Sequence, residues 1–284
     1  MPATNGVSIS IATYLLIGPM LLLAFTLALS FGGFAILAAD RGTPVAWSAK
    51  VVSVYVREAL ARCLIILMSP LGWTNPGPSL WSVGASTEVK RTPVLLLPGY
   101  GTNRSCLAPL CLFLANRGWT WLWAVNLGRR DRSLSDHAAE IGKQVDQLRR
   151  RTGAAKIDIV AFSMGGLVAA WYLRHLDGDQ HIRRLVTIGT PWRGTRLAVF
   201  ARSASAREMI YGAHVLDALA PPPAPTICIW SPDDPVVVPT SSGVAEQGAQ
   251  SVRIDAAGHI DMLVSARVYR AVQAALSHPI SEHA

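Results

Sequence analysis

The first 39 residues of this 284-residue chain contain no Asp, Glu, Lys or Arg, and from Val7 onward they are almost entirely apolar. A membrane span needs about 20 apolar residues, whereas a buried core helix has about 10–14. The run is long enough to cross a bilayer with tilt, or to bend back as a short hairpin at Gly18-Pro19 or Gly32-Gly33. We therefore predict that residues 1–40 form an N-terminal transmembrane anchor.

A cleaved signal peptide would begin with basic residues, contain about 7–15 apolar residues and end in a small-residue cleavage site. Here no basic residue precedes the apolar run, which is about twice too long and ends in Leu37-Ala38-Ala39. We therefore expect the anchor to be retained. The alternative is a helical hairpin buried in a soluble domain.

Residues 41–90 form the second predicted segment, a linker with an amphipathic juxtamembrane helix. Within Lys50–Arg62, polar side chains gather on one half of a helical wheel and most apolar ones on the other. Basic and aromatic residues in this segment suit the membrane interface. A helix that packs on the following domain explains the pattern equally well. The polar half comprises Lys50, Ser53, Arg57, Glu58 and Arg62, and the apolar half comprises Val52, Tyr55, Val56, Ala59 and Leu60.

The chain is basic, with a net charge of +8, but its charges do not form a stripe. The run Arg149-Arg150-Arg151 ends a predicted helix, where cations suit the helix dipole. A nucleic-acid-binding surface needs a more extended basic patch. We therefore expect no nucleic-acid partner, and we expect the positive charge to favour contact with anionic lipid head groups.

The four cysteines, Cys63, Cys106, Cys111 and Cys228, lack the short spacings of a zinc site. Cys106 and Cys111 lie five residues apart in one predicted helix, so their side chains diverge. We expect free and mostly buried thiols, and no metal site.

Residues 91–284 alternate short apolar runs with stretches of helical periodicity. Strands that are apolar along their whole length, joined by helices, are typical of a parallel sheet covered on both faces. We therefore predict a doubly wound α/β domain with a mostly parallel sheet. The predicted strands are Val94–Leu97, Trp121–Val125, Ile157–Ala161, Leu185–Ile188, Ile227–Trp230 and Val252–Ile254.

A reactive serine is predicted at the end of the third of these strands. The sequence runs from a strand through Ala161-Phe162-Ser163-Met164-Gly165 directly into a helix. A serine at such a turn is held in a strained backbone conformation that projects its hydroxyl above the sheet. Small residues two positions before and after it allow strand and helix to approach. Ala161 and Gly165 occupy those positions, so alanine replaces the usual first glycine of G-x-S-x-G.

The same turn predicts donors for a developing oxyanion. The N–H group of Met164, at the start of the helix, points towards the place where negative charge forms on a substrate carbonyl. A second donor is expected from the loop after the first strand, Pro98-Gly99-Tyr100-Gly101, where we predict the N–H group of Tyr100. The alternative for this loop is an ordinary Pro-Gly turn.

A serine nucleophile needs a general base, and the base needs an orienting acid. His259 follows the last predicted strand in a loop before a helix, whereas the other six histidines lie in helical or terminal polar contexts where a solvated role is expected. The acid is expected after the penultimate strand, where Asp233 and Asp234 compete. Asp261 is a third and more distant candidate.

These motifs resemble those of the α/β-hydrolase superfamily, and within it the bacterial lipases and esterases. The resemblance covers about residues 93–276 and departs from the commonest pattern at Pro98 and Phe162, where histidine is frequent. In hydrolases of this shape the acid usually precedes a short apolar run, which favours Asp234 over Asp233. The matching motifs are PGYG, Asn103-Arg104, AFSMGG, IGTPWRGT, SPDDPVVVP and AGHIDM.

The resemblance implies a serine carboxylester hydrolase that needs no cofactor. Ser163 attacks the ester, His259 transfers the proton, Asp234 orients the imidazole, and Tyr100 and Met164 hold the oxyanion. The expected partners are a lipid or ester substrate and the bilayer, and the oligomeric state stays open. The alternatives are a thioesterase, amidase or acyltransferase acting on membrane lipids, or a non-catalytic membrane scaffold.

The segment between Pro191 and Pro225 is too short for a large lid domain, although Val199–Leu219 is long enough for a mobile helix over the pocket. Basic residues follow the anchor but do not precede it, and the positive-inside tendency then places the catalytic domain in the cytoplasm. We therefore expect a location at a bacterial inner membrane. The basic residues are Arg41, Lys50, Arg57 and Arg62.

Overall fold

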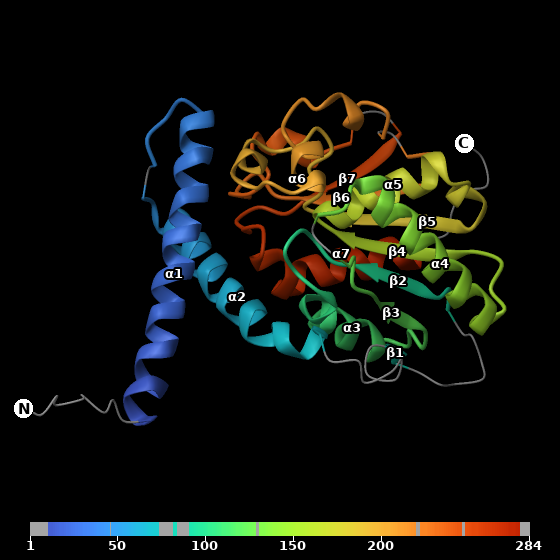
Figure 1. Cartoon of the computed structure of the whole chain (residues 1–284), viewed down its shortest axis with the longest axis horizontal. Coiled ribbons are helices and arrows are strands. Elements are labelled where there is room, and N and C mark those ends of the chain that lie inside the picture. The colour runs from blue at the N-terminus through green and yellow to red at the C-terminus, as the bar shows by residue number, and fades with distance from the viewer. Residues whose placement is uncertain are drawn as a thin grey trace, which may run out of the picture.

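A mixed sheet with helices on both faces forms the centre of the molecule (Figure 1). Its strand order is β1-β3-β2-β4-β5-β6-β7, and all neighbouring strands are parallel except β1 and β3. The doubly wound α/β prediction is therefore confirmed. The computed structural model describes residues 11–45, 47–73, 82–83, 91–128, 131–219, 222–245 and 248–278.

All six predicted strands are present, with small shifts at their ends. Every residue of β2 and β4 is buried, which explains why these segments are apolar without alternation. The one charged residue in these two strands is Asp158 in β4, which is buried beside the guanidinium of Arg183. β1 is a two-residue edge strand, too short for its sequence to predict it. The strands are β1 (Ser82–Val83), β2 (Val94–Leu97), β3 (Leu122–Ala124), β4 (Ile157–Phe162), β5 (Ile182–Ile188), β6 (Thr226–Trp230) and β7 (Ala249–Arg253).

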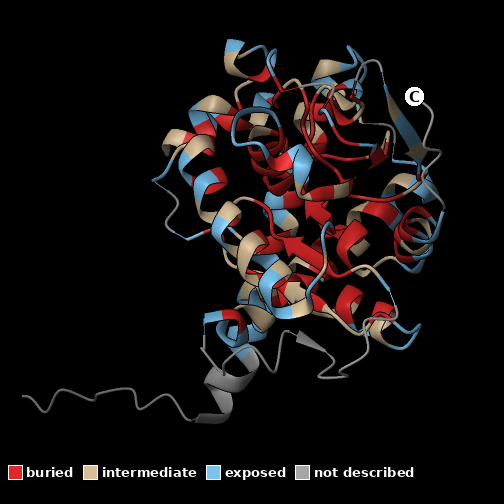
Figure 2. Ribbon diagram, turned by 90° about the vertical axis from the view of Figure 1, so that its right-hand side faces the viewer, coloured by how far each residue is buried: buried red, intermediate tan, exposed pale blue. Residues whose placement is uncertain are grey.

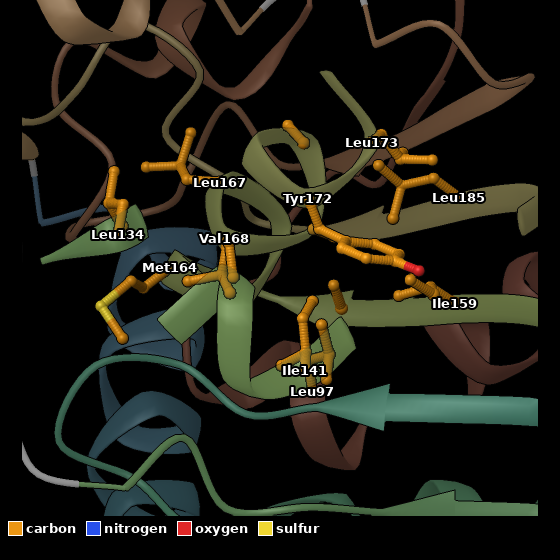
Figure 3. Close-up of a cluster of buried hydrophobic side chains, with 14 of the residues drawn as sticks. Leu97, Leu134, Ile141, Ile159, Met164, Leu167, Val168, Tyr172, Leu173 and Leu185 are labelled. Carbon is orange, nitrogen blue, oxygen red and sulfur yellow. The ribbon is translucent and has the colours of Figure 1, made fainter. Parts of the chain in front are cut away.

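Two hydrophobic clusters lie on opposite faces of the sheet. One joins α4 and α5 to the strands, and Figure 3 shows Ile141, Val168 and Tyr172 of these helices beside Ile159 and Leu185. The other joins α2, α3 and α7 to the opposite face. Figure 2 shows the result, with buried strands inside helices whose outer surfaces are exposed. These helices are α3 (Ala108–Ala115), α4 (Leu134–Thr152), α5 (Met164–His175) and α7 (Ala266–Ser277).

α1 (Ile11–Asp40) is one continuous helix that stands beside the α/β domain (Figure 1). Neither glycine pair bends the chain back, so the hairpin alternative is wrong. Over Ile17–Asp40, α1 is the one helix in the described ranges that is long and apolar enough to span a membrane. Its residues from Ile17 to Phe25 are mostly exposed, whereas Phe34 is buried.

α2 (Ala49–Trp73) packs on both α1 and the α/β domain. The Tyr55 hydroxyl donates a hydrogen bond of 3.0 Å to the carbonyl of Leu27 in α1. Of the two interpretations of this helix, packing on the domain is the one observed. Arg57 and Glu58 of its polar half contact the domain, and Ala59 of the apolar half is buried, while Val52 and Leu60 are exposed.

Candidate active site

Ser163 occupies a sharp turn between β4 and α5. Its φ of 54° and ψ of −123° lie in a region that residues other than glycine rarely adopt. Small neighbours make the turn possible, because a Cβ at Gly165 would lie 2.7 Å from the carbonyl oxygen of Pro98. Thr190 lies in the loop after β5, and its hydroxyl donates a hydrogen bond of 2.9 Å to the Ser163 carbonyl, which holds the turn. The sequence motif thus produces the strained turn that it predicts.

Ser163, His259 and Asp234 form a continuous hydrogen-bonded chain. The Oγ atom of Ser163 lies 3.0 Å from Nε2 of His259, and Nδ1 of His259 lies 2.7 Å from Oδ2 of Asp234. The other carboxylate oxygen of Asp234 accepts the N–H groups of Val236 and Val237 at 2.7 and 2.9 Å. The loops after β4, β6 and β7 therefore bring together three side chains that are distant in sequence.

Asp233 points away from His259. Its Oδ2 accepts the N–H group of Ala256 at 2.8 Å and lies 2.9 Å from Nζ of Lys50. The side chain of Asp261, the third candidate acid, pairs with Arg57 at 3.2 Å. Asp233 and Asp261 thus connect loops and α2, while Asp234 faces the imidazole.

The imidazole of His259 is enclosed by close packing. The Phe162 ring centroid lies 4.8 Å from that of His259. On another side Gly189 adopts a positive φ of 58°, and a Cβ there would lie 3.1 Å from Nδ1 of His259. These neighbours leave His259 only 3% exposed, so the ring is held in place between Ser163 and Asp234.

The two predicted oxyanion donors lie on either side of the Ser163 turn. Met164 is the first residue of α5, where the N–H group has no partner within the helix. Tyr100 lies in the turn after β2 and lines the cavity beside Ser163. Gly99 lets this turn lie close to Ser163, because a Cβ at Gly99 would lie 2.9 Å from the Ser163 Cβ. The role of these N–H groups in oxyanion binding stays a prediction.

A cavity of about 220 Å³ opens beside Ser163. Most of its lining is apolar, and at its edge the Phe200 side chain is 77% exposed. Val199–Leu219, which is long enough for one mobile helix, does not form a single helix. Ser203 caps a new helix there and Gly212 adopts a positive φ of 80°, so the chain breaks into η4 (Arg196–Phe200), α6 (Ala204–Glu208) and η5 (His214–Leu216).

Two buried titratable residues were not expected from the sequence. His137, predicted to be solvated, is buried on α4, and burial lowers its pKa. Glu58, on the polar half of α2, is completely buried, and burial raises its pKa. On the helical wheel Glu58 shares the polar half with Lys50, Ser53, Arg57 and Arg62. This position did not predict burial, because a polar face usually meets solvent.

The cysteines are all unpaired thiols, as predicted. Among the described residues, no group of three or more His, Cys, Asp or Glu side chains is placed to hold a metal ion.

Comparison with known proteins places this geometry in context. The family model for the alpha/beta hydrolase fold matches residues 92–220. The lipase BlEst2 of Bacillus licheniformis in its mature form is 13% identical, with a TM-score of 0.62 over 70% of this chain and 97% of the lipase. Lipase B of Aspergillus fumigatus is also 13% identical, with a TM-score of 0.62 over 87% of this chain and 85% of that one.

A third similar structure is 2-hydroxy-6-oxo-6-phenylhexa-2,4-dienoate hydrolase from a Rhodococcus strain. It is 16% identical, with a TM-score of 0.51 over 66% of this chain and 90% of the hydrolase. At such low identities these similarities show a shared fold and no more. Together with the family model and the sheet topology, they show that residues 92–220 and the strands that follow adopt the alpha/beta hydrolase fold.

Proposed function

We propose that this protein is a membrane-anchored serine hydrolase that cleaves carboxylic esters through an acyl-enzyme intermediate. The observation that carries the proposal is the hydrogen-bonded chain from Asp234 through His259 to Ser163 at a strained strand-to-helix turn. A serine hydroxyl becomes a competent nucleophile when a base takes its proton and an acid stabilises the resulting imidazolium.

The chemistry proceeds in two halves. Ser163 Oγ attacks the ester carbonyl carbon, its proton passes to Nε2 of His259, and the negative charge forms on the carbonyl oxygen beside the N–H groups of Tyr100 and Met164. The tetrahedral intermediate collapses, and His259 gives its proton to the departing alcohol. Water then attacks the acyl group on Ser163, again losing a proton to His259, which returns it to Ser163 as the acid leaves. Asp234 stays ionised and orients the imidazole throughout.

The cavity beside Ser163 favours a short acyl chain. Its volume of about 220 Å³ lies below the roughly 300–1,000 Å³ of pockets that enclose drug-sized ligands. Leu197, Ala206, Met209 and Val237 line it with apolar atoms. An ester with a short apolar acyl group fits this lining, whereas a long chain would have to leave the cavity past Phe200.

Membrane anchoring is supported by apolar side chains that face away from the domain on both α1 and α2. Soluble proteins rarely expose such a continuous apolar surface. Polar residues of α2 contact the domain, while Val52, Val56 and Leu60 of its apolar half face outward and are suited to lipid. The exposed side chains are Met20, Leu21, Phe25, Leu29, Phe31, Val52, Val56, Leu60, Leu64, Leu67, Leu71 and Trp73.

For the side of the membrane, we propose the cytoplasm, as the positive-inside tendency indicates. Each of the four basic residues after the anchor also contacts protein: Arg41 bonds to Pro232, Lys50 pairs with Asp233, Arg57 with Asp261 and Arg62 with Glu58. These contacts give the four residues a structural role on whichever side of the membrane the domain lies. A C-terminal alkaline phosphatase fusion of the full chain should be inactive, and an active fusion would place the domain in the periplasm.

The proposal is tested by labelling the full-length protein in detergent with a fluorophosphonate probe. The wild type should be labelled and should hydrolyse short p-nitrophenyl esters, and Ser163→Ala should do neither. Equal labelling of Ser163→Ala would reject the nucleophile. Faster turnover of acyl-CoA, amide or phospholipid substrates than of simple esters would favour the alternative reactions, and absence of labelling in the wild type would favour a non-catalytic scaffold.

A further inference from the structure

Glu58 connects α2 to the loop that carries His259. Its carboxylate oxygen Oε2 accepts the N–H group of Asp261, two residues after His259, at 2.9 Å. The other oxygen, Oε1, accepts a hydrogen bond of 2.7 Å from Nη2 of Arg62. The Glu58 side chain is completely buried, so both hydrogen bonds are shielded from water.

Gly258 creates the space that Glu58 occupies. A Cβ at Gly258 would lie 2.5 Å from Oε2 of Glu58 and 3.0 Å from its Cβ. Any larger residue directly before His259 would therefore displace the carboxylate. The backbone on both sides of His259 thus meets one side chain from α2.

Neighbouring residues of α2 hold the same loop. Arg57 donates a hydrogen bond to the carbonyl of Ala256 and pairs with the carboxylate of Asp261. Lys50 pairs with Asp233, which accepts the Ala256 N–H group and so joins the acid loop to the histidine loop. The helix therefore contacts both loops that bear the predicted base and acid.

The electrostatic environment gives Glu58 a part in the chemistry beyond packing. Burial raises the pKa of its carboxyl, while Arg62, the Asp261 N–H group and His259 favour the ionised form and Asp234 opposes it. Arg57 and the Asp261 carboxylate are the other charged groups at this contact. A negative charge in a shielded site favours a nearby imidazolium, the form of His259 that arises when Ser163 loses its proton.

We propose that Glu58 is a positioning residue for His259. It holds the backbone on both sides of the imidazole, and its negative charge stabilises the imidazolium that forms when Ser163 loses its proton. This role rests on the proposed serine-hydrolase function. Through Glu58, α2 contributes to the active site, so the membrane-proximal segment does more than tether the domain.

The test compares three variants of the full-length protein. Glu58→Gln keeps an oxygen that can accept the Asp261 N–H group but removes the charge. Glu58→Asp keeps the charge but is one methylene too short to hold the loop in the same way. Glu140→Gln is the matched control, because Glu140 lies on α4, over the opposite face of the sheet. Within the described part of the chain, its side chain pairs only with Lys143.

For Glu58→Gln we expect kcat for a short ester and the fluorophosphonate labelling rate to fall about tenfold, with KM nearly unchanged. Glu140→Gln should match the wild type. A merely structural role for Glu58 would not confine the loss to kcat.

A wild-type kcat and labelling rate in Glu58→Gln would overturn the proposal. If that variant does not fold, Glu58→Asp decides: slower labelling with KM nearly unchanged is expected, and wild-type labelling would reject the role. Failure of the proposed function gives a different result, since it leaves the wild type itself unlabelled or Ser163→Ala labelled.

Discussion

Gly33 of the apolar helix α1 lies directly against Pro235, the residue that follows Asp234. A Cβ at Gly33 would lie 2.7 Å from the Pro235 carbonyl oxygen and 3.2 Å from its Cβ. Seven residues later, Asp40 at the end of α1 pairs with Arg196 at 2.7 Å, in the segment that forms part of the cavity wall. The last turns of α1 thus support the acid loop and the cavity, while residues 17–25 of the helix are mostly exposed.

We predict that Gly33→Leu impairs activity and that Gly32→Leu does not. The first substitution must displace the Asp234 loop, and we expect a fall in kcat of at least about tenfold. A Cβ at Gly32 meets nothing within 4 Å, so this neighbouring change adds the same apolar bulk without a collision. Ester hydrolysis by both variants in the same detergent is the measurement, and equal activities would show that the contact does not influence the site.

A second prediction concerns strain at Ser163. Glycine adopts the observed positive φ without the steric penalty that a Cβ imposes, so Ser163→Gly should be inactive but more stable than Ser163→Ala. The difference should be about 1 kcal/mol, at the lower end of the cost of such strained residues. Urea unfolding of both inactive variants provides the comparison, and an equally stable Ser163→Ala would mean that the turn is not strained.

The two adjacent aspartates should differ sharply on substitution. Asp234→Asn should lower kcat by about 10⁴, the loss known for a Ser-His-Asp triad whose orienting acid becomes an amide. Asp233→Asn keeps an oxygen for the Ala256 N–H group and loses only the partly exposed pair with Lys50, so kcat should stay within about tenfold. Steady-state kinetics of both variants tests the assignment, and the reverse order of effects would make Asp233 the acid.

The cavity predicts selectivity for acyl-chain length. p-Nitrophenyl butyrate should be hydrolysed with a higher kcat/KM than the palmitate ester, because the cavity beside Ser163 measures about 220 Å³. Ala206 is buried and lines this cavity, so Ala206→Leu should shorten the preferred chain further. Phe200, at the exposed edge, offers the control, since Phe200→Ala should leave the butyrate rate nearly unchanged. A palmitate preference in the wild type would contradict this interpretation of the cavity.

Thiol reactivity gives a pH-dependent prediction. Burial raises the pKa of Cys106 and of Cys111 to about 12, so both stay protonated at pH 8 and become thiolates only in strong alkali. Iodoacetamide at pH 8 should modify neither cysteine in the folded protein and should modify both in denaturant. Mass spectrometry of the peptides measures this, and rapid alkylation of the native protein would show that this part of the core is open.

Much of the fold and of the candidate site was predictable from local patterns. The unbroken apolar runs of β2 and β4 indicated a buried parallel sheet, because only such a sheet needs strands that are apolar on both faces. Ser163 was recognisable because a strained turn requires small neighbours close in sequence. His259 and Asp234 follow successive strand ends, and parallel strands bring such ends to one edge of the sheet.

The contacts of α1 and α2 were not predictable in this way. A helical wheel separates polar from apolar residues but does not say which of them meet the protein, and in α2 the charged Glu58 is buried together with the apolar Ala61 and Ile65. Glu58 shows the consequence, since its burial depends on Gly258, a residue 200 positions away, and on the N–H group of Asp261.

By itself, the sequence determined the α/β sheet, the strained serine turn and the presence of a long apolar segment, since each depends on the spacing of residue types within a few turns or strands. Only the tertiary structure decided that Asp234 faces His259 while Asp233 faces Lys50, and that the helices after the N-terminus support the loops of the site. The physical reason is that neighbouring side chains in a loop diverge according to long-range packing, which local sequence spacing does not encode.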